Sequence, residues 1–342
     1  MNRILVVGPS WVGDMVMAQS LFKALKKNQS NCRITVLAPA WSEPILARMP
    51  EVSASVTMPI GHGRLALGQR WRLGRSLSGQ FDQAIVLPGS YKSALVPMFA
   101  GIRRRTGFRG EQRYGLLNDL RQLDKKSLPY NVQRFVALGL APEESAVPLD
   151  LIEQPALEIN LDQRSELCRR FDLAFEMTTI ALCPGAEFGP AKQWPAAHFA
   201  EVARHQLDQG RQILILGSEK DQSVAGQICQ QATGCIDLAG KTTLGEVIDL
   251  MSLASHVITN DSGLLHVAAA VGCHVVAIYG SSSDAFTPPL TQTADRLYLE
   301  LSCRPCYQRS CPLGHLDCLN KLDPSRVVES IETSNARKQT LN

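Results

Sequence analysis

The first residues that could take part in a reaction lie in the loop Gly8-Pro9-Ser10-Trp11-Val12-Gly13-Asp14, which follows an apolar run. Its spacing excludes a dinucleotide fingerprint, because that motif needs a glycine where Ser10 stands. Asp14 argues against a P-loop, because it replaces the required lysine and would repel a phosphate. The dipole of the following helix favours the ionised form of an acid at this position. Asp14 is therefore a candidate general base for an attacking hydroxyl, with helix capping as the alternative.

A second loop, Asn260-Asp261-Ser262-Gly263-Leu264-Leu265-His266, follows another apolar run and opens a helical pattern. Backbone N–H groups at Ser262 and Gly263, together with the helix dipole, predict a diphosphate site. Asp261 would be repelled by phosphate, so we expect it to cap the helix or to accept hydrogen bonds from sugar hydroxyls. His266 lies one turn into the helix, where it can donate to a phosphate oxygen or fill a structural role.

Two further loops follow predicted strands. The Gly- and Pro-rich segment from Gly185 through Ala186 to Lys192 cannot be regular structure, and it presents its lysine just before Trp194-Pro195, where a new helix is expected to begin. A lysine there can neutralise a diphosphate leaving group, although most lysines only face solvent. Glu219 follows another strand end, where acids of nucleotide-binding folds accept hydrogen bonds from ribose. The sequence contains no Asp-x-Asp pair, so we expect that the chemistry requires no divalent metal and no cofactor.

These loops need a scaffold that gathers strand ends. Short apolar runs alternate with amphipathic segments, as in parallel βαβ units covered by helices on both faces. The predicted strands are 4–8, 34–38, 84–88, 179–183, 212–217, 235–238, 257–259 and 275–279. The predicted helices are 15–27, 91–99, 161–171, 196–209, 222–232, 244–253 and 263–271. Because ligands bind at the carboxyl edge of such sheets, we expect all four loops to lie at such edges.

The strand–helix pattern restarts once. The first series ends near residue 140, a stretch at 141–155 has the composition of a linker, and a second series begins at Thr179. A length of 342 residues also favours two domains. The sequence therefore predicts an α/β protein of two Rossmann-like domains, 1–155 and 156–342, whose parallel sheets face a central cleft. Whether a C-terminal helix near Pro324–Thr333 packs back on the first domain is left open.

Charge is unevenly spread along the chain. Residues 1–130 hold 19 Lys and Arg against 7 Asp and Glu, whereas the rest holds 16 against 25. This asymmetry predicts an anionic partner for the N-terminal part, and nucleic acid, anionic lipid or a phosphorylated glycan would each fit. The sequence shows neither a signal-peptide core nor an apolar run of the roughly 18 residues that cross a membrane, so we expect a cytoplasmic protein.

Ten cysteines in a cytoplasmic chain are expected to be reduced thiols. Four of them gather with His315 near the C-terminus: Cys303, Cys306, Cys311 and Cys318. The first pair has the spacing of metal ligands, but the second pair does not match common zinc-finger patterns. We therefore favour free thiols over a metal site.

With these residues assembled, the chain resembles the ADP-heptose glycosyltransferases of glycosyltransferase family 9. The resemblance is carried by residues 4–21, 87–119, 183–195, 217–221 and 259–270, with PSWVGDM and PGAEFGPAK as the most specific motifs. It implies a GT-B fold and an inverting transfer of L-glycero-D-manno-heptose from ADP-heptose to the first heptose on Kdo2-lipid A, in lipopolysaccharide core biosynthesis. The alternatives are a family member with another acceptor position, a nucleotide-sugar epimerase on a similar fold, and a non-enzymatic binding module.

The resemblance also implies roles for individual residues. Asp14 would be the general base, and Lys192 would hold the departing diphosphate. Contacts with the donor are implied for Gly185, Ala186, Lys192, Glu219, Asp261, Ser262, Gly263 and His266.

The basic N-terminal part fits an acceptor that carries phosphates and Kdo carboxylates, because arginine forks bind such anions well. An acceptor in the inner leaflet would draw this part to the inner face of the membrane, and no nucleic acid partner is expected. Arg70, Arg72 and Arg75 follow a Gly-rich stretch that we expect to close over the acceptor. The candidate acceptor-binding residues are Lys92, Arg103, Arg104, Arg105, Arg109 and Arg113.

Overall fold

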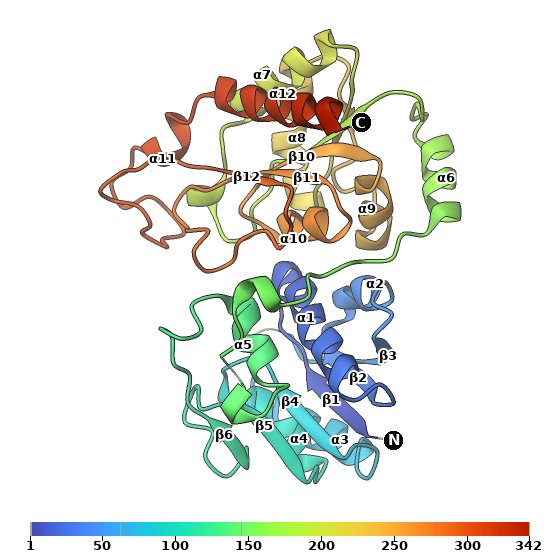
Figure 1. Cartoon of the computed structure of the whole chain (residues 1–342), viewed down its shortest axis with the longest axis vertical. Coiled ribbons are helices and arrows are strands. Elements are labelled where there is room, and N and C mark those ends of the chain that lie inside the picture. Colours follow the sequence, from blue (N-terminus) through green and yellow to red (C-terminus); the bar gives the residue numbers. More distant parts are fainter. Residues whose placement is uncertain (1, 62, 145, 342) are drawn as a thin grey trace. The chain divides into compact units, whose positions relative to one another are not determined.

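The computed structural model describes residues 2–61, 63–144 and 146–341, with side chains up to residue 337. It divides into two compact units, Met1–Glu158 and Ile159–Asn342 (Figure 1). The division falls three residues beyond the expected one, because the residues directly after the expected linker still pack on the first unit. There, the buried Gln19 side chain exchanges two hydrogen bonds with the backbone of Ala156, at 2.8 and 2.9 Å.

The first unit is built on a six-stranded, all-parallel sheet of order β3-β2-β1-β4-β5-β6. Its strands are β1 (Arg3–Val7), β2 (Arg33–Ala38), β3 (Val52–Thr57), β4 (Gln83–Val86), β5 (Arg104–Phe108) and β6 (Asp119–Arg121). Its helices are α1 (Val12–Asn28), α2 (Glu43–Leu46), α3 (Leu67–Ser76), α4 (Leu95–Phe99) and α5 (Asn131–Ala137). Short 3₁₀ turns are η1 (Ala40–Ser42), η2 (Tyr91–Ala94), η3 (Pro142–Glu144) and η4 (Leu149–Leu151).

The second unit repeats this plan with the sheet order β12-β11-β10-β7-β8-β9, again all parallel. Its strands are β7 (Thr179–Cys183), β8 (Gln212–Ile215), β9 (Ile236–Asp237), β10 (Ala254–Asn260), β11 (His274–Ile278) and β12 (Ala294–Leu297). Its helices are α6 (Leu161–Arg170), α7 (Ala196–Asp208), α8 (Gln222–Gln231), α9 (Leu244–Met251), α10 (Gly263–Ala270), α11 (Asp317–Asn320) and α12 (Pro324–Leu341). Two 3₁₀ turns, η5 (Pro190–Lys192) and η6 (Glu219–Asp221), lie in its loops.

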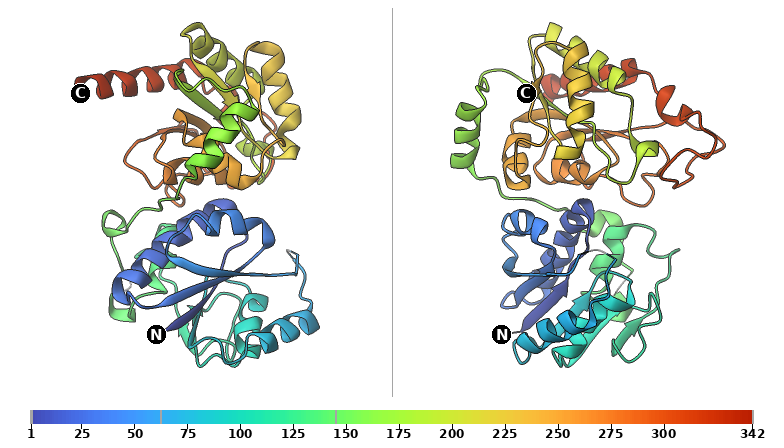
Figure 2. Two further views of the ribbon diagram at one scale, coloured as in Figure 1. Left: turned by 90° about the vertical axis from the view of Figure 1, so that its right-hand side faces the viewer. Right: turned by 180° about the vertical axis from the view of Figure 1, so that it is seen from behind.

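Continuous apolar strands explain this architecture. Ile4–Val7 of β1 and Thr179–Cys183 of β7 are buried along their whole length, as expected for strands covered on both faces. Burying each large aliphatic side chain contributes about 1.5–3 kcal/mol. In the first unit, the α1–α5 pair and the α3–α4 pair cover opposite faces of the sheet, as Figures 1 and 2 show. The prediction of two Rossmann-like parallel sheets is confirmed.

Strand order also determines where ligands can bind. Each sheet has the same doubly wound order, in which the direction of winding reverses between β1 and β4 in the first unit and between β7 and β10 in the second. At such a switch point, the loops after the two strands diverge and leave a crevice at the carboxyl edge. The loop with Asp14 follows β1, the loop with Lys192 follows β7, and the loop with Asp261 follows β10. These three sequence-predicted loops therefore lie at the two switch points, whereas the loop with Glu219 follows the neighbouring strand β8.

Helix α12 belongs to the second unit, where it packs on α7 and beside β11 and β12. Its residues Val327 and Ile331 are fully buried in the same core as Trp194 and Phe199. Among the helices of the described residues, none combines the length and the apolar composition that crossing a bilayer requires.

Candidate active site

Asp14 is held at the carboxyl edge of the first sheet. The N-cap residue of α1 is Trp11, so Asp14 is the third residue of the helix and lies in its first turn. One oxygen of its half-buried carboxylate accepts a hydrogen bond of 2.9 Å from Asn131 Nδ2, at the start of α5. Helices α1 and α5 pack against each other, which fixes this contact across 117 residues of sequence. The arrangement orients the carboxylate, as a general base requires.

Lys92 and Arg109 share the edge at which Asp14 lies. Lys92 is in η2, which follows β4, and the exposed Arg109 directly follows β5. Two hydrogen bonds made by Glu111 join their loops. The Glu111 carboxylate accepts one of 2.8 Å from the Tyr91 backbone N–H, and the Glu111 backbone N–H donates one of 3.0 Å to the Gly89 carbonyl. These contacts keep two cationic side chains on neighbouring loops at one edge of the sheet.

The cluster Arg103–Arg105 lies elsewhere. Arg104 opens β5 and pairs in register with Gln83, the first residue of β4, so the cluster is at the amino-terminal edge of the sheet. The carboxyl end of β5 at Phe108 is four residues away, or about 13 Å at the usual rise per strand residue. The structure therefore does not bring Arg103, Arg104 and Arg105 together with Asp14, contrary to the sequence-based expectation.

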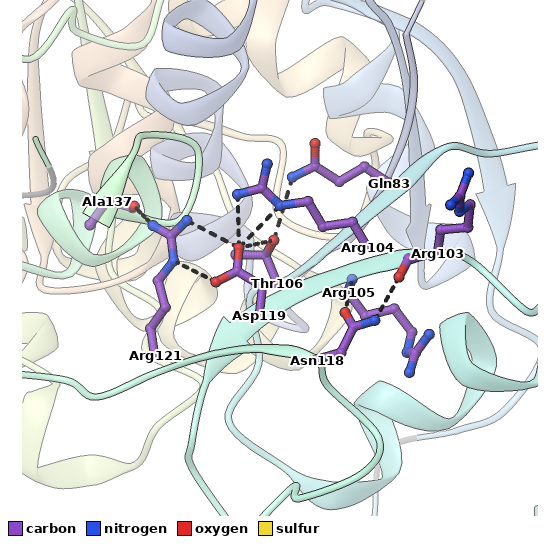
Figure 3. Close-up of polar contacts among 9 residues, drawn as sticks. All are labelled: Gln83, Arg103, Arg104, Arg105, Thr106, Asn118, Asp119, Arg121 and Ala137. Carbon is purple, nitrogen blue, oxygen red and sulfur yellow. Dashed lines mark hydrogen bonds and ion pairs between the residues drawn. The ribbon is translucent and has the colours of Figure 1, made fainter. Parts of the chain in front are cut away.

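Two of these arginines also have structural partners (Figure 3). Arg104 pairs with Asp119 at 2.9 Å, as Figure 3 shows. The Arg105 guanidinium donates to the backbone carbonyls of Leu116 and Ile102. Burial alone would raise the pKa of Asp119, but hydrogen bonds from Arg121, Arg104 and Thr106 outweigh it and lower that pKa. Alternation along β5 turns Arg104 and Arg105 to opposite faces, so the three neighbours do not form one cationic surface.

Arg113 is fully buried and is not an anion-binding side chain. Its guanidinium donates to the carbonyl of Pro88 at 2.7 Å, to the Ser93 hydroxyl at 3.2 Å and to the carbonyl of Phe108. Burial lowers the pKa of Arg113 to about 10. This side chain ties the ends of β4 and β5 together, and the expectation of a direct acceptor contact is not supported by this position.

In the second unit, a buried ion pair joins the two loops at the switch point. Lys192 Nζ contacts Asp261 Oδ2, and the two side chains are only 16% and 6% exposed. The Lys192 ammonium also lies 5.0 Å from the centre of the Phe188 ring. Asp261 thus binds the lysine, a partner that neither of its expected roles included. A lysine with one carboxylate partner still has two donors for an incoming anion.

Asn260 fixes these loops, and sequence reasoning gave it no role. Its buried amide donates to the Pro184 carbonyl at 2.7 Å and accepts from the Trp194 backbone N–H at 3.0 Å. The last residue of β10 therefore clamps both ends of the loop that carries Lys192. An asparagine directly before an Asp-Ser-Gly helix start is the available signal, because its amide can satisfy buried backbone groups that strands leave unpaired.

The Lys192 loop is supported from its other side by residues near the C-terminus. The Arg309 carbonyl accepts from the Ala191 N–H at 3.1 Å, and Arg309 Nε donates to the Phe188 carbonyl at 2.7 Å. Gly189, at a φ of +144°, leaves no room for a Cβ beside the Arg309 carbonyl. The support of Lys192 by a segment more than a hundred residues away could not be read from local pattern.

The remaining predicted donor residues divide between two loops. Ala186 is buried, and Gly185 packs so tightly on the Asp221 carboxylate that a Cβ would collide with it. Asp221 accepts two hydrogen bonds of 2.8 Å from Ser218, which shapes the turn after β8 and leaves Glu219 exposed. Glu219 therefore projects from the loop next to the one that carries Gly185.

Helix α10 begins at Gly263, with Ser262 as its N-cap residue and Asp261 immediately before it. The Ser262 hydroxyl lies 3.4 Å from that of Thr259. His266 is 5% exposed, and among the described residues its Nδ1 atom has no hydrogen-bond partner. Burial lowers the pKa of His266 to about 4, with Asp261 raising it and Lys192 lowering it. His266 is therefore neutral at pH 7 and can still donate one hydrogen bond.

The depressed pKa of His266 predicts a specific dependence of stability on pH. Because the unfolded chain protonates this histidine near pH 6.5 and the folded chain only near pH 4, stability is lost as the pH falls between these values. Between pH 7 and pH 5, the free energy of unfolding measured with urea should fall by about 2 kcal/mol more for the wild type than for His266→Gln. Parallel losses in the two proteins would contradict the buried, neutral histidine.

The C-terminal cysteines gather around one small cavity. This cavity is lined by His315 and by four cysteines, Cys303, Cys306, Cys311 and Cys318. The four cysteines are free thiols. Within the part of the chain that the structure describes, no group of three or more His, Cys, Asp or Glu is arranged to hold a metal ion.

Comparison with known proteins defines the family. The model for glycosyltransferase family 9 (heptosyltransferase) matches residues 70–317. Lipopolysaccharide heptosyltransferase 2 of Escherichia coli (strain K12) is 45% identical over 96% of this chain and 97% of its own, and lipooligosaccharide heptosyltransferase 2 of Haemophilus influenzae is 47% identical over 85% and 87%. The solved structure of E. coli ADP-heptose lipopolysaccharide heptosyltransferase II superposes with a TM-score of 0.89 at 42% identity, covering 99% of this chain and 100% of that one.

The fold is that of a GT-B glycosyltransferase. The chain belongs to glycosyltransferase family 9, the heptosyltransferases. It is therefore an enzyme that transfers a glycosyl group, and the epimerase and the non-enzymatic binding module are not favoured.

Proposed function

We propose that this enzyme transfers L-glycero-D-manno-heptose from ADP-heptose to the first heptose of the lipopolysaccharide inner core, with inversion at the anomeric carbon. Two observations carry the proposal: an oriented carboxylate at the switch point of the first unit, and a partly available ammonium group at the switch point of the second. The names of the relatives at 45–47% identity support this acceptor step over the other acceptor positions in the family.

Asp14 is the general base in this proposal. The acceptor hydroxyl oxygen attacks the anomeric carbon while its proton passes to the Asp14 carboxylate, which Asn131 orients. The bond between the anomeric carbon and the diphosphate oxygen breaks in the same displacement, and its electron pair leaves with ADP. A single displacement with attack opposite the leaving group inverts the configuration.

In this proposal, the second unit stabilises the negative charge of the ADP leaving group. Lys192 and the N-terminal N–H groups of α10 at Ser262 and Gly263 stabilise the diphosphate as negative charge develops on it. His266 donates a hydrogen bond from its neutral ring, and Glu219 accepts hydrogen bonds from the ribose. Because these groups supply the positive charge, the proposal includes no divalent metal and no other cofactor.

Lys92 and Arg109 bind the anionic groups of the acceptor. Reversing both charges, in Lys92→Glu/Arg109→Glu, is expected to raise the KM for the acceptor about tenfold or more, because charge-assisted hydrogen bonds contribute about 1.5–3 kcal/mol. The KM for ADP-heptose should stay unchanged. Arg103→Glu is the control, because Arg103 is exposed and directly precedes β5, at the amino edge of the same sheet. An equal loss in the control, or of donor use, would refute the assignment.

The reaction type is tested by measuring ADP release. Purified enzyme is incubated with ADP-heptose alone, with a heptosyl-Kdo2 acceptor, and with a Kdo2 acceptor that lacks heptose. We expect rapid ADP release only with the heptosylated acceptor. Rapid release with the unheptosylated acceptor, or without any acceptor, would overturn the proposed function.

A further inference from the structure

A surface segment of the first unit combines apolar and basic side chains that the proposed chemistry does not use. Leu65, Leu67 and Trp71 are 52%, 53% and 52% exposed, unusually high values for large apolar side chains. The exposed basic residue Arg64 directly precedes them, and the exposed basic residues Arg72 and Arg75 follow them. We call these six residues the α3 surface.

Packing of α3 determines which side of the helix faces outward. Gly74 lies so close to α4 that a Cβ would meet the Phe99 Cβ at 2.5 Å, and Leu77 is buried after the end of the helix. Leu67, Trp71 and Arg75 follow one another at intervals of four residues, so they form a stripe along one side of the helix. Gly74 lies three residues after Trp71 and seven after Leu67, so the stripe borders the side of the helix that faces α4, and its three side chains remain exposed to solvent.

The turn before the helix is fixed by a buried arginine. Arg70 is 4% exposed, and its guanidinium donates to the Leu65 carbonyl at 2.7 Å and to the Arg64 carbonyl at 3.2 Å. Arg70 therefore organises the turn and does not reach a ligand, contrary to the expectation that it closes over the acceptor. The hydrogen bonds from Arg70 therefore hold Arg64 and Leu65 in their exposed positions.

The charge of this segment favours an anionic occupant. Between Glu51 and Asp82 the sequence contains four arginines and no acidic residue. Tryptophan and leucine with arginine on one helix side match the interface of an anionic bilayer, where the apolar groups enter the headgroup region and the arginines meet lipid phosphates. Nucleic acid would use the arginines but would leave the leucines without a role.

The segment also begins at the appropriate edge of the sheet. Helix α3 follows β3 and precedes β4, two strands that run parallel in one sheet, so its first turn lies toward the carboxyl edge. Asp14, Lys92 and Arg109 are at that same edge. A bilayer held by the α3 surface would bring a lipid-anchored acceptor to the edge at which its hydroxyl is activated.

We propose that the α3 surface is the docking site of this enzyme for an anionic lipid bilayer. This inference rests on the proposed function, since it assumes an acceptor anchored in a membrane. The surface adds membrane recruitment to the chemistry, and it acts on the bilayer and not on the sugar of the acceptor.

Vesicle binding by the full chain tests the proposal. Co-sedimentation is measured with vesicles of phosphatidylcholine alone and of phosphatidylcholine mixed with phosphatidylglycerol. Wild type should bind the anionic vesicles, and Arg72→Glu/Arg75→Glu should weaken this binding at least about 30-fold, since each arginine contributes about 1 kcal/mol. Leu67→Ser/Trp71→Ser should also lose binding, whereas Arg33→Glu and Phe175→Ser, exposed control substitutions elsewhere, should not. Wild-type binding by both α3 variants would overturn the proposal.

A second measurement separates the bilayer from the acceptor sugar. Transfer is assayed on a delipidated, water-soluble acceptor glycan and on the lipid-anchored acceptor in anionic vesicles. Both α3 variants should match wild type on the soluble glycan and be at least tenfold slower on vesicles. Equal losses on both substrates would overturn the proposal in favour of direct glycan binding. If wild type fails on the soluble glycan, the proposed function fails, and the co-sedimentation result still decides whether the surface binds lipid.

Discussion

Asp14→Asn is expected to lower kcat for heptosyl transfer by about 10²–10⁴-fold, the range that a positioned general base contributes. The substitution keeps the shape of the side chain and an oxygen that can accept the 2.9 Å hydrogen bond from Asn131, so the fold should be retained. Only the ability to take a proton is lost. The dissociation constant for ADP should remain within about twofold of the wild-type value, because the group is assigned to the acceptor side of the reaction.

Glu43→Gln supplies a matched control for this variant. Glu43 is also an acid in the first turn of a helix of the first unit, but it is exposed and carries no proposed role. Its replacement should leave kcat unchanged. If Asp14→Asn retains transfer within a few fold of wild type, Asp14 is not the base, and the carboxylate only stabilises the start of α1.

Lys192→Met is expected to have the second-largest effect, through both chemistry and stability. Removing the ammonium group takes away charge stabilisation of the leaving group, which should lower kcat by about 10²-fold or more. It also leaves the Asp261 carboxylate buried without its cation, and breaking such a pair typically costs about 3–5 kcal/mol of folding free energy. ADP should bind about tenfold more weakly or worse, which isothermal titration calorimetry can measure.

A double variant separates the two consequences. Lys192→Met/Asp261→Asn has no unpaired buried charge, so urea unfolding should show most of the lost stability regained. ADP affinity should nevertheless remain weak, because the cation is still missing. Lys192→Arg keeps the charge and should bind ADP better than Lys192→Met does. If the double variant regains wild-type ADP affinity, Lys192 serves the fold and not the diphosphate.

How far the fold follows from the sequence depends on the type of strand. Runs such as Thr179–Cys183, buried on both faces, are nearly continuously apolar and were predicted with their bounds. Strand β5, with the sequence RRTGF, lacks an apolar pattern and could not be predicted. Its two arginines are accommodated because they bind Asp119 and backbone carbonyls. The short or partly exposed edge strands β3, β6 and β12 carry too little apolar pattern to be recognised.

The same limit applies to the candidate site. A loop directly after an apolar strand can be placed at the carboxyl edge from local pattern, which is why Asp14, Lys192 and Asp261 were found. Contacts between distant segments carry no local signal, so the Lys192–Asp261 pair and the Asn131 hydrogen bond were not foreseen. The candidate acceptor-binding arginines do not form one group, and without β5 the sequence could not show that Arg103–Arg105 lie at the start of a strand whereas Arg109 follows its end.

The measurement that tests the account most directly is mass spectrometry of the product formed from ADP-heptose and a defined acceptor truncated after its first heptose. The account predicts the gain of a single heptose residue, attached to that first heptose in the inverted anomeric configuration that NMR of the same product reports. Addition of heptose to Kdo, a retained configuration, or no product with this acceptor would contradict it.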